Sequence, residues 1–217
     1  MRELIVNTFL TLDGVMQAPG GPEEDTSGRF EHGGWSFGYW DEQMQGVIGE
    51  SMSKPFDLVL GRKTYEIFAA YWPHSEGPAA EPLNEATKHV ASTTLKELEW
   101  ENSKLIEGEV PEGVSALKAQ DGPELQVHGS ANLIQTLLEH ELIDEFRLWI
   151  FPLVLGTGKR LFDGGTVPAG MELESSQASS TGVIITTYRS GAEIKYGSFA
   201  DETPSEAEEA RGAAQSG

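Results

Sequence analysis

The chain has 217 residues, of which 35 are acidic and 15 are basic, and its formal net charge at pH 7 is −20. This excess of negative charge argues against nucleic acids and anionic membranes as partners, because both are polyanions. The chain contains no cysteine, which excludes disulfide bonds, thiolate catalysis and Cys-ligated metal centres.

The first apolar segment, Leu4–Leu10, predicts a strand rather than a targeting signal. Asn7 and Thr8 interrupt it, and no small-residue cleavage site follows. No apolar run long enough to cross a bilayer occurs elsewhere, so we expect a cytoplasmic protein.

Beyond the strand, Asp13 is a candidate catalytic residue that orients a polar substrate edge or relays a proton. The alternative interpretation is a turn residue beside Gly14.

The segment Gln17–Trp40 is predicted to be an irregular loop. Its first half is rich in Gly, Pro and acidic residues, and its second half carries five aromatic side chains. Long loops of this kind are often functional, so we expect a lid in which Trp35 and Trp40 cover a flat heteroaromatic substrate. Alternatively, the aromatic side chains pack onto the domain or onto a second subunit. Asp41, which follows, is either a second candidate catalytic residue or the N-cap of a helix.

The rest of the chain alternates strand-like and helix-like segments. The clearest helix is Asn132–Glu141, in which apolar residues at i, i+1, i+4 and i+5 form one stripe. Strand followed by helix, repeated, predicts a mostly parallel sheet with helices on both faces. The other predicted strands are Leu58–Leu60, His89–Ser92, Leu125–His128, Phe146–Phe151, Val183–Tyr188 and Glu193–Tyr196. The other predicted helices are Asp41–Ser53, Lys63–Tyr71 and Val114–Gln120.

One domain is expected to span residues 1–199. From about residue 200 onward the chain has no bulky apolar side chain and is rich in Glu, Ala, Ser and Gly. Burial in such a segment cannot offset the entropy lost on ordering, so residues 200–217 are predicted to form a disordered acidic tail.

The first strand-to-helix junction after the loop has the composition of a phosphate site. Gly61 allows close backbone approach, Arg62 and Lys63 supply positive charge, and Thr64 places a hydroxyl near a helix N-terminus. The alternative is an ordinary capped helix with two solvated cations.

A second junction repeats the arrangement. Gly129, Ser130 and Ala131 are small residues that leave backbone N–H groups exposed, and Asn132 begins the strongest helix. Many α/β turns contain such residues for steric reasons only. Two such junctions in one sheet nevertheless favour a dinucleotide site, because open α/β sheets bind ligands beyond the carboxyl ends of their strands.

Standard motifs for nucleotides and metals are missing. No G-x-G-x-x-G follows a strand, and the segment Gly156–Lys159 lacks the upstream Gly and the following Ser or Thr of a P-loop. The five histidines have no ligand spacing, so we expect no metal.

Four segments in this order resemble the reductase domain that dihydrofolate reductases share with the C-terminal half of the bifunctional riboflavin-biosynthesis deaminase-reductase, in its stand-alone form. The resemblance covers roughly residues 1–199. It implies a dihydrofolate-reductase-like three-layer α/β/α fold with a mixed, mostly parallel central sheet, and NADPH as cofactor. The segments are LIVNTFLTLDGVM at 4–16, LGRKTYE at 60–66, VHGSANLIQTLLEHELIDEF at 127–146 and FPLVLGTGKRLF at 151–162.

The resemblance also implies roles for particular residues. The junction at 61–64 would contact the phosphate and nicotinamide side of NADPH, and that at 129–132 the pyrophosphate. Ser92 and Thr93 match the stretch that binds the adenosine 2′-phosphate, although many relatives carry Arg in place of Thr93, which leaves NADH open. Thr11 lies at the first-strand exit, which lines the substrate pocket.

The resemblance implies a reductase that transfers hydride to a small pterin-like or heterocyclic substrate, and a homodimer. One alternative is the riboflavin-pathway 5-amino-6-(5-phosphoribosylamino)uracil reductase. It is disfavoured because such enzymes typically carry Lys after the Asp-Gly pair, whereas this chain has Val15. Another alternative is a non-catalytic nucleotide- or ligand-binding protein with the same fold.

Overall fold

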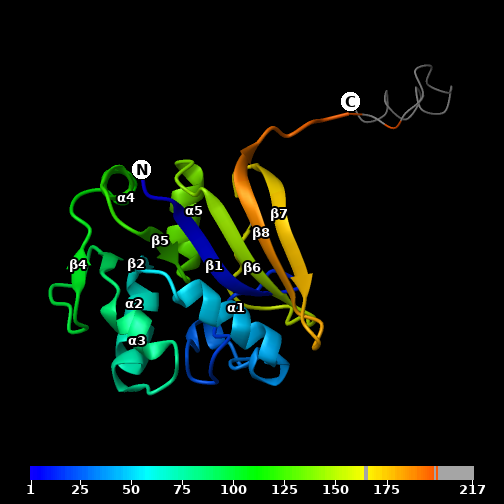
Figure 1. Ribbon diagram of the computed structural model, residues 1–217, viewed down its shortest axis with the longest axis horizontal. Coiled ribbons are helices and arrows are strands. Elements are labelled where there is room, and N and C mark those ends of the chain that lie inside the picture. Colours follow the sequence, from blue (N-terminus) through cyan, green and yellow to red (C-terminus); the bar gives the residue numbers. More distant parts are fainter. Residues whose placement is uncertain (164–165, 198, 200–217) are drawn as a thin grey trace.

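The computed structural model describes residues 1–163, 166–197 and 199 (Figure 1). Its strands are β1 (Leu4–Thr11), β2 (Phe56–Gly61), β3 (Lys88–Ala91), β4 (Ser103–Leu105), β5 (Glu124–Val127), β6 (Glu145–Phe151), β7 (Gly170–Ala178) and β8 (Ile184–Ala192). Its α-helices are α1 (Glu42–Met52), α2 (Arg62–Tyr71), α3 (Ala80–Glu85), α4 (Val110–Ala119) and α5 (Ala131–Glu139). The predicted tail at 200–217 lies outside the described residues.

The described strands form one sheet in the order β4-β3-β2-β5-β1-β6-β8-β7. The pairs from β4 to β6 are parallel, and β8 pairs antiparallel with both β6 and β7. The predicted α/β class with a mixed, mostly parallel sheet is therefore confirmed. Because β2, β5 and β1 run parallel, their carboxyl ends lie at the same edge of the sheet.

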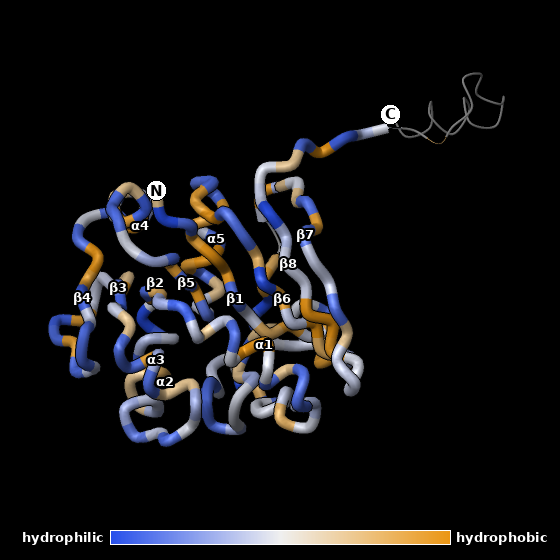
Figure 2. The backbone as a smooth tube through the Cα atoms, viewed as in Figure 1, coloured by the Kyte–Doolittle hydropathy of each residue, from blue (hydrophilic) through white to orange (hydrophobic). Residues whose placement is uncertain are grey.

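Helices cover both faces of the sheet (Figure 1). On one face, Leu4 and Val6 of β1 pack with the predicted apolar stripe of α5. On the other, Trp149 and Phe151 of β6 pack with Met44 of α1, and β2 packs with α2 and α3. Figure 2 shows hydrophobic stretches in the central strands, whereas β7 is mostly hydrophilic. The alternation of side chains along each strand accounts for apolar packing on both faces of the sheet.

Five elements differ from the sequence-based prediction. The helix predicted at Val114–Gln120 already begins at Val110, because Pro111 suits a first helical turn. The strand predicted at Glu193–Tyr196 is wrong: β8 ends at Ala192, and among the described residues those at 193–197 pair with no strand. The polar edge strand β7 was missed, since it has one neighbour and no apolar period. The short elements β4 and α3 were also missed.

Candidate functional site

The two junctions predicted to bind a phosphorylated cofactor lie side by side. The hydroxyl oxygens of Thr64 and Ser130 are 2.7 Å apart and share a hydrogen bond. A Cβ atom on Gly61 would lie 2.5 Å from Cβ of Ser130, and one on Gly129 would lie 3.2 Å from Oγ1 of Thr64. The junctions therefore form one continuous surface, and only glycine fits at position 61.

The helices at this surface begin without side-chain caps. Ser130 is the N-cap of α5 and has a left-handed backbone (φ +73°), and its side chain makes no capping bond. Gly61, the N-cap of α2, has no side chain that could accept a hydrogen bond from the first-turn N–H groups. Ala131 is half-buried and Asn132 exposed in the first turn of α5. In the part of the chain that the structure describes, the first-turn N–H groups of α2 and α5 thus have no N-cap side chain as acceptor, and a helix end in this state can bind an anion.

A cavity of about 370 Å³ lies beside the first junction. The Arg62 guanidinium at its edge donates to Thr94 Oγ1 at 2.8 Å and to Glu66 Oε1 at 2.7 Å. Ser92 Oγ accepts from the backbone N–H of Leu95 at 3.0 Å. Lys63 is exposed, 3.9 Å from a Glu66 oxygen, and does not line the cavity. The lining residues are Arg62, Ala91, Ser92, Thr93, Thr94, Ile106, Gly108 and Val110.

This cavity includes residues that the sequence did not indicate. Thr94 follows the predicted pair Ser92 and Thr93 directly, and its exposed hydroxyl holds Arg62. Ile106, Gly108 and the start of α4 come from the segment after β4, a strand only three residues long. Nothing in the local sequence of these residues marks them as part of a site. They lie at the cavity because β4, which precedes them, pairs with β3.

Asp13 is bound by hydrogen-bond donors from two parts of the chain. The Thr11 hydroxyl donates to it at 2.6 Å, and the backbone N–H groups of Leu155 and Gly156 donate at 3.2 and 2.8 Å. Arg160 approaches the same carboxylate at 3.3 Å. The Thr11 hydrogen bond, with smaller effects from these backbone bonds, holds the pKa of Asp13 well below its usual value. These contacts favour an ionised anchor over a proton relay.

Asp41 caps α1 and ties it to the turn between β7 and β8. Its Oδ1 accepts from Met44 N–H at 2.8 Å, and its Oδ2 accepts from the Ser180 hydroxyl at 2.6 Å and the Ser180 N–H at 2.8 Å. The hydrogen bond from Ser180, followed by that from Met44, lowers the pKa of Asp41. The contacts of Asp41 are therefore those of a helix N-cap, and the catalytic role of Asp41 stays a prediction.

The aromatic segment packs against the sheet. The Trp35 indole is buried, donates to the Gln17 carbonyl at 2.7 Å and meets Phe151 edge-on at 5.2 Å. Trp40 is half-buried against Phe9, with ring centroids 5.6 Å apart. The predicted substrate residues thus differ in exposure: Trp35 is part of the core, whereas Trp40 is half-buried. Thr11, the third, is buried and accepts from the Val15 N–H.

His128 lies directly before the second junction. Its Nε2 is 2.7 Å from Gln126 Oε1, and burial, with a smaller effect from Arg147, lowers its pKa to about 4. The ring is therefore neutral at pH 7. Because the folded pKa is below the unfolded value, its contribution to stability is complete above about pH 6.5 and is lost as the pH falls towards 4.

We expect the free energy of unfolding of His128→Gln to depend less on pH below pH 6.5 than that of the wild type. The shift corresponds to roughly 3 kcal/mol at most, so urea unfolding at pH 7 and pH 4.5 should show a smaller loss for the variant than for the wild type. His74→Gln, at an exposed site, is the control and should keep the wild-type slope. Equal slopes for wild type and His128→Gln would contradict the assignment.

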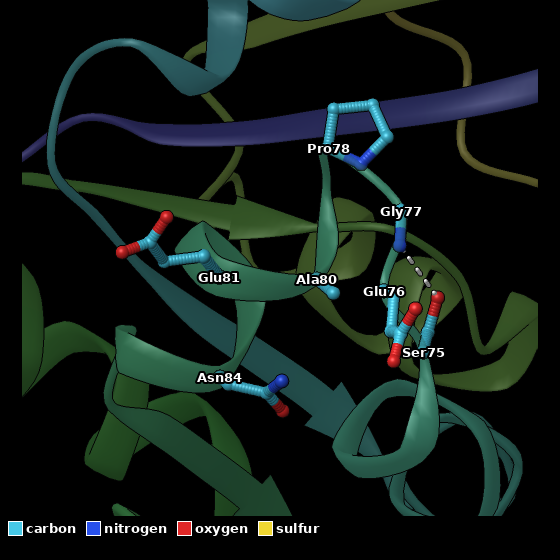
Figure 3. A pocket seen from close by; sticks show the side chains of 7 residues that line it. All are labelled: Ser75, Glu76, Gly77, Pro78, Ala80, Glu81 and Asn84. Atoms are coloured by element: carbon cyan, nitrogen blue, oxygen red, sulfur yellow. Dashed lines mark hydrogen bonds between the residues drawn. The ribbon is translucent and has the colours of Figure 1, made fainter.

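A second cavity, of about 380 Å³, lies away from these residues around α3 (Figure 3). Glu76 and Glu81 are among its lining side chains, and Gly77 donates to the Ser75 hydroxyl at 3.3 Å. None of the predicted site residues lines it. Within the described residues, no three His, Asp or Glu side chains are grouped to hold a metal ion. None of the helices described is long and apolar enough to cross a membrane.

Comparisons with known proteins agree with this architecture. A sequence profile of the RibD C-terminal domain matches residues 2–185. The uncharacterized protein YyaP of Bacillus subtilis is 28% identical over 192 residues, which cover 86% of this chain and 94% of YyaP. A second uncharacterized B. subtilis protein, YwjB, is 26% identical over 120 residues, covering 55% of this chain and 66% of YwjB.

Solved structures show the same fold. A candidate riboflavin biosynthesis protein from Shewanella sp. PV-4 superposes with a TM-score of 0.68 at 23% identity, covering 88% of this chain and 99% of that one. Dihydrofolate reductase from Enterococcus faecalis, complexed with NADP(H) and RAB-propyl, superposes with a TM-score of 0.54 at 14% identity, covering 88% and 97%. The predicted dihydrofolate-reductase-like fold is confirmed.

Proposed function

The chain belongs to the RibD C-terminal domain family, and we propose on that premise that it is an NADPH-dependent reductase that transfers hydride to a small, flat heterocyclic substrate. The observation that carries the proposal is the contact between the two junctions through Thr64 and Ser130. It joins two uncapped helix ends into one surface at the carboxyl edge of the sheet, where α/β proteins bind nucleotides.

The residues present suit NADPH. The uncapped starts of α2 and α5 offer N–H donors to a pyrophosphate, and the tight contact at Gly61 leaves no side chain between them. Arg62, Ser92 and Thr93 bring one cation and two hydroxyls to the neighbouring cavity, as a ribose phosphate requires. The NADP(H) bound to the E. faecalis reductase supports the same choice of cofactor.

NADPH supplies the hydride when bound. The protein's task is to hold the two reactants together and to exclude water from between them. The junction residues orient the nucleotide, and the aromatic side chains of Phe9 and Trp40 offer an apolar surface beside the end of β1. Asp13 positions the exit of β1 by fixing it to the segment 155–160.

The riboflavin-pathway reductase is the second candidate. The similarity to the candidate riboflavin biosynthesis protein from Shewanella sp. PV-4 favours it. Against it stands Val15, which is fully buried and paired with Arg160 in a β-bridge, so the position offers no cation to a phosphoribosyl group. A non-catalytic binding protein is a further alternative, which a turnover assay with NADPH and a panel of pterins and pyrimidines distinguishes from the reductase. The homodimer stays a prediction.

Charge reversal at Arg62 tests the cofactor. Arg62→Glu is expected to weaken NADPH binding by roughly 10- to 100-fold, because it removes a charge-assisted hydrogen bond and adds a carboxylate beside Glu66. NADH, which lacks the 2′-phosphate, should lose less. Titration calorimetry with both nucleotides measures the effect. Lys54→Glu is the control, since this exposed cation precedes β2 and so lies at the opposite edge of the sheet. Unchanged NADPH affinity in Arg62→Glu would refute the cofactor assignment.

A further inference from the structure

Lys88, the first residue of β3, is a fully buried lysine. Lysine side chains are almost never fully buried unless they are paired with an acid. Lys118, which is also buried, pairs with Asp144 at 2.6 Å, whereas among the described residues no carboxylate lies within ion-pair distance of Lys88. Because an unpaired charge is costly to bury, other groups must compensate for the missing acid.

The ammonium group of Lys88 has one acceptor for each of its three protons. It donates to the backbone carbonyls of Asn84 at 2.5 Å and of Glu101 at 3.0 Å, and it lies 4.1 Å from the centroid of the Trp100 ring. The negative face of an indole ring attracts a cation. A neutral amine has two protons and a lone pair, so it would direct that lone pair at one of the three acceptors. These surroundings therefore fit the charged form of the side chain.

The contacts of the ammonium group hold one end of an irregular loop, residues 92–102, which connects β3 to β4. At the start of the loop, two backbone N–H groups donate to the Ser92 hydroxyl. At its end, the Trp100 N–H donates to the Tyr65 hydroxyl at 3.1 Å. Within the described part of the chain, no hydrogen bond fixes residues 96–99. The loop is therefore held at its two ends, and the buried ammonium group secures the second.

The same loop forms part of the wall of the cavity beside the first junction. Its first three residues line this cavity together with Arg62, and the segment that follows β4 supplies three more lining residues. Tyr65 lies in α2, the helix that begins at Arg62. Through the hydrogen bond between Trp100 and Tyr65, the buried ammonium group therefore fixes the loop relative to the helix that carries Arg62.

The proton of Lys88 is bound less tightly than that of an exposed lysine. Burial lowers the pKa of Lys88 to about 8, and the charge of Glu101 opposes this effect. The ammonium form therefore prevails at pH 7, and the neutral amine prevails at pH 9. Other ionisable side chains on the surrounding elements are exposed, bonded elsewhere or on the opposite face of the sheet, namely Tyr65 and Glu66 in α2, Glu81 and Glu85 in α3, Lys96, Glu97 and Glu99 in the loop, and Asp57, His89 and Lys104 in the strands.

We propose that Lys88 is a positioning residue for the nucleotide: its ammonium group holds Trp100 and loop 92–102 against α2, and loss of its proton releases the loop and weakens nucleotide binding. The effect on the nucleotide rests on the proposed reductase function, whereas the attachment of the loop does not. Lys88 does not line the cavity, so it acts on the nucleotide through Trp100 and the loop.

The same proton has the opposite effect on global stability. The folded pKa of Lys88 lies below the value of about 10.4 for an unfolded chain, so the unfolded state binds more protons above about pH 8. The contribution of Lys88 to the free energy of unfolding therefore rises with pH in this range, because the cost of burying the charge disappears. Nucleotide affinity that falls while this contribution rises distinguishes a positioning role from a purely structural one.

Fluorine NMR of protein labelled with 5-fluorotryptophan tests the attachment of the loop without nucleotide. The Trp100 resonance, assigned with Trp100→Phe, should shift between pH 7 and pH 9 in the wild type, with a midpoint at about 8. Lys88→Arg, which stays charged at pH 9, should remove the shift. Lys104→Met, at an exposed position on the opposite face of the sheet, is the control and should keep it.

Titration calorimetry with NADPH tests the effect on the nucleotide. Wild-type affinity should fall roughly tenfold from pH 7 to pH 9, the order expected when a cation–π contact is lost and two charge-assisted hydrogen bonds become neutral. Lys88→Met should bind NADPH weakly at both pH values, and Lys88→Arg should bind it equally at both. If Lys88→Met does not fold, the comparison of wild type, Lys88→Arg and Lys104→Met decides the outcome.

A Trp100 resonance that stays unchanged from pH 7 to pH 9, or that shifts equally in Lys88→Arg, would overturn the attachment of the loop. Wild-type NADPH affinity that does not depend on pH would overturn the positioning role. A resonance that follows the charge of Lys88 in a protein that binds no NADPH at either pH would reject the proposed cofactor and the positioning role together, and would leave the attachment of the loop intact.

Discussion

Replacing Gly61 with alanine is expected to weaken NADPH binding at least tenfold and to lower the free energy of unfolding by about 1–3 kcal/mol. The new Cβ would overlap the side chain of Ser130, whose own Cβ would be 2.5 Å away. Relief requires the starts of α2 and α5 to move apart, and that motion breaks the Thr64–Ser130 hydrogen bond. Calorimetric titration with NADPH and urea unfolding measure the two effects.

The matched control is Gly46→Ala in α1, where a Cβ meets nothing within 4 Å. It should raise stability slightly, because alanine suits a helix interior better than glycine. The double variant Gly61→Ala/Ser130→Gly removes the overlap, and glycine also suits the left-handed backbone of position 130. We expect it to recover most of the lost stability. A Gly61→Ala protein with wild-type stability and NADPH affinity would show that the two junctions are not in close contact.

Replacing Asp13 with alanine is expected to lower the free energy of unfolding by about 3 kcal/mol. The change leaves the Thr11 hydroxyl and the N–H groups of Leu155 and Gly156 without their acceptor, and Arg160 without its carboxylate. Asp121→Ala, at an exposed position, should change stability by less than about 0.5 kcal/mol. Urea unfolding at pH 7 compares the variants.

The dependence of stability on pH in the acid range gives a second test of the role of Asp13. Since the folded pKa is lowered, the carboxylate stabilises the fold above its ordinary pKa and loses that contribution as the pH falls below it. The difference between wild type and Asp13→Ala should therefore shrink in acid. Asp13→Asn separates an anchor from a proton relay. An anchor predicts a loss of stability, whereas a relay predicts a lower kcat with unchanged stability, and the second result would contradict our interpretation.

Much of the fold and part of the candidate site follow from local sequence. The stripe in Asn132–Glu141 and the apolar strand at Leu4–Leu10 predict α5 and β1, because residue spacing alone sets which side chains share a face. Gly61 and Gly129 mark both junctions for a similar reason: a Cβ at Gly61 would overlap the side chain of Ser130, and one at Gly129 would crowd the side chain of Thr64. The edge strand β7 escaped prediction because a strand with one neighbour needs no apolar pattern.

Only the tertiary structure decided what the polar residues contact. The carboxylate of Asp13 accepts hydrogen bonds from backbone N–H groups that lie 142 and 143 residues further along the chain. Asp41 accepts one from Ser180, which is 139 residues away in the sequence. In the sequence, Asn7 merely interrupts an apolar run, whereas in the sheet it is half-buried on the same face as Phe9. Hydrophobic periodicity is a local property that a sequence displays directly. Partners of polar groups depend on which strands become neighbours, and that is set by the packing of the whole chain.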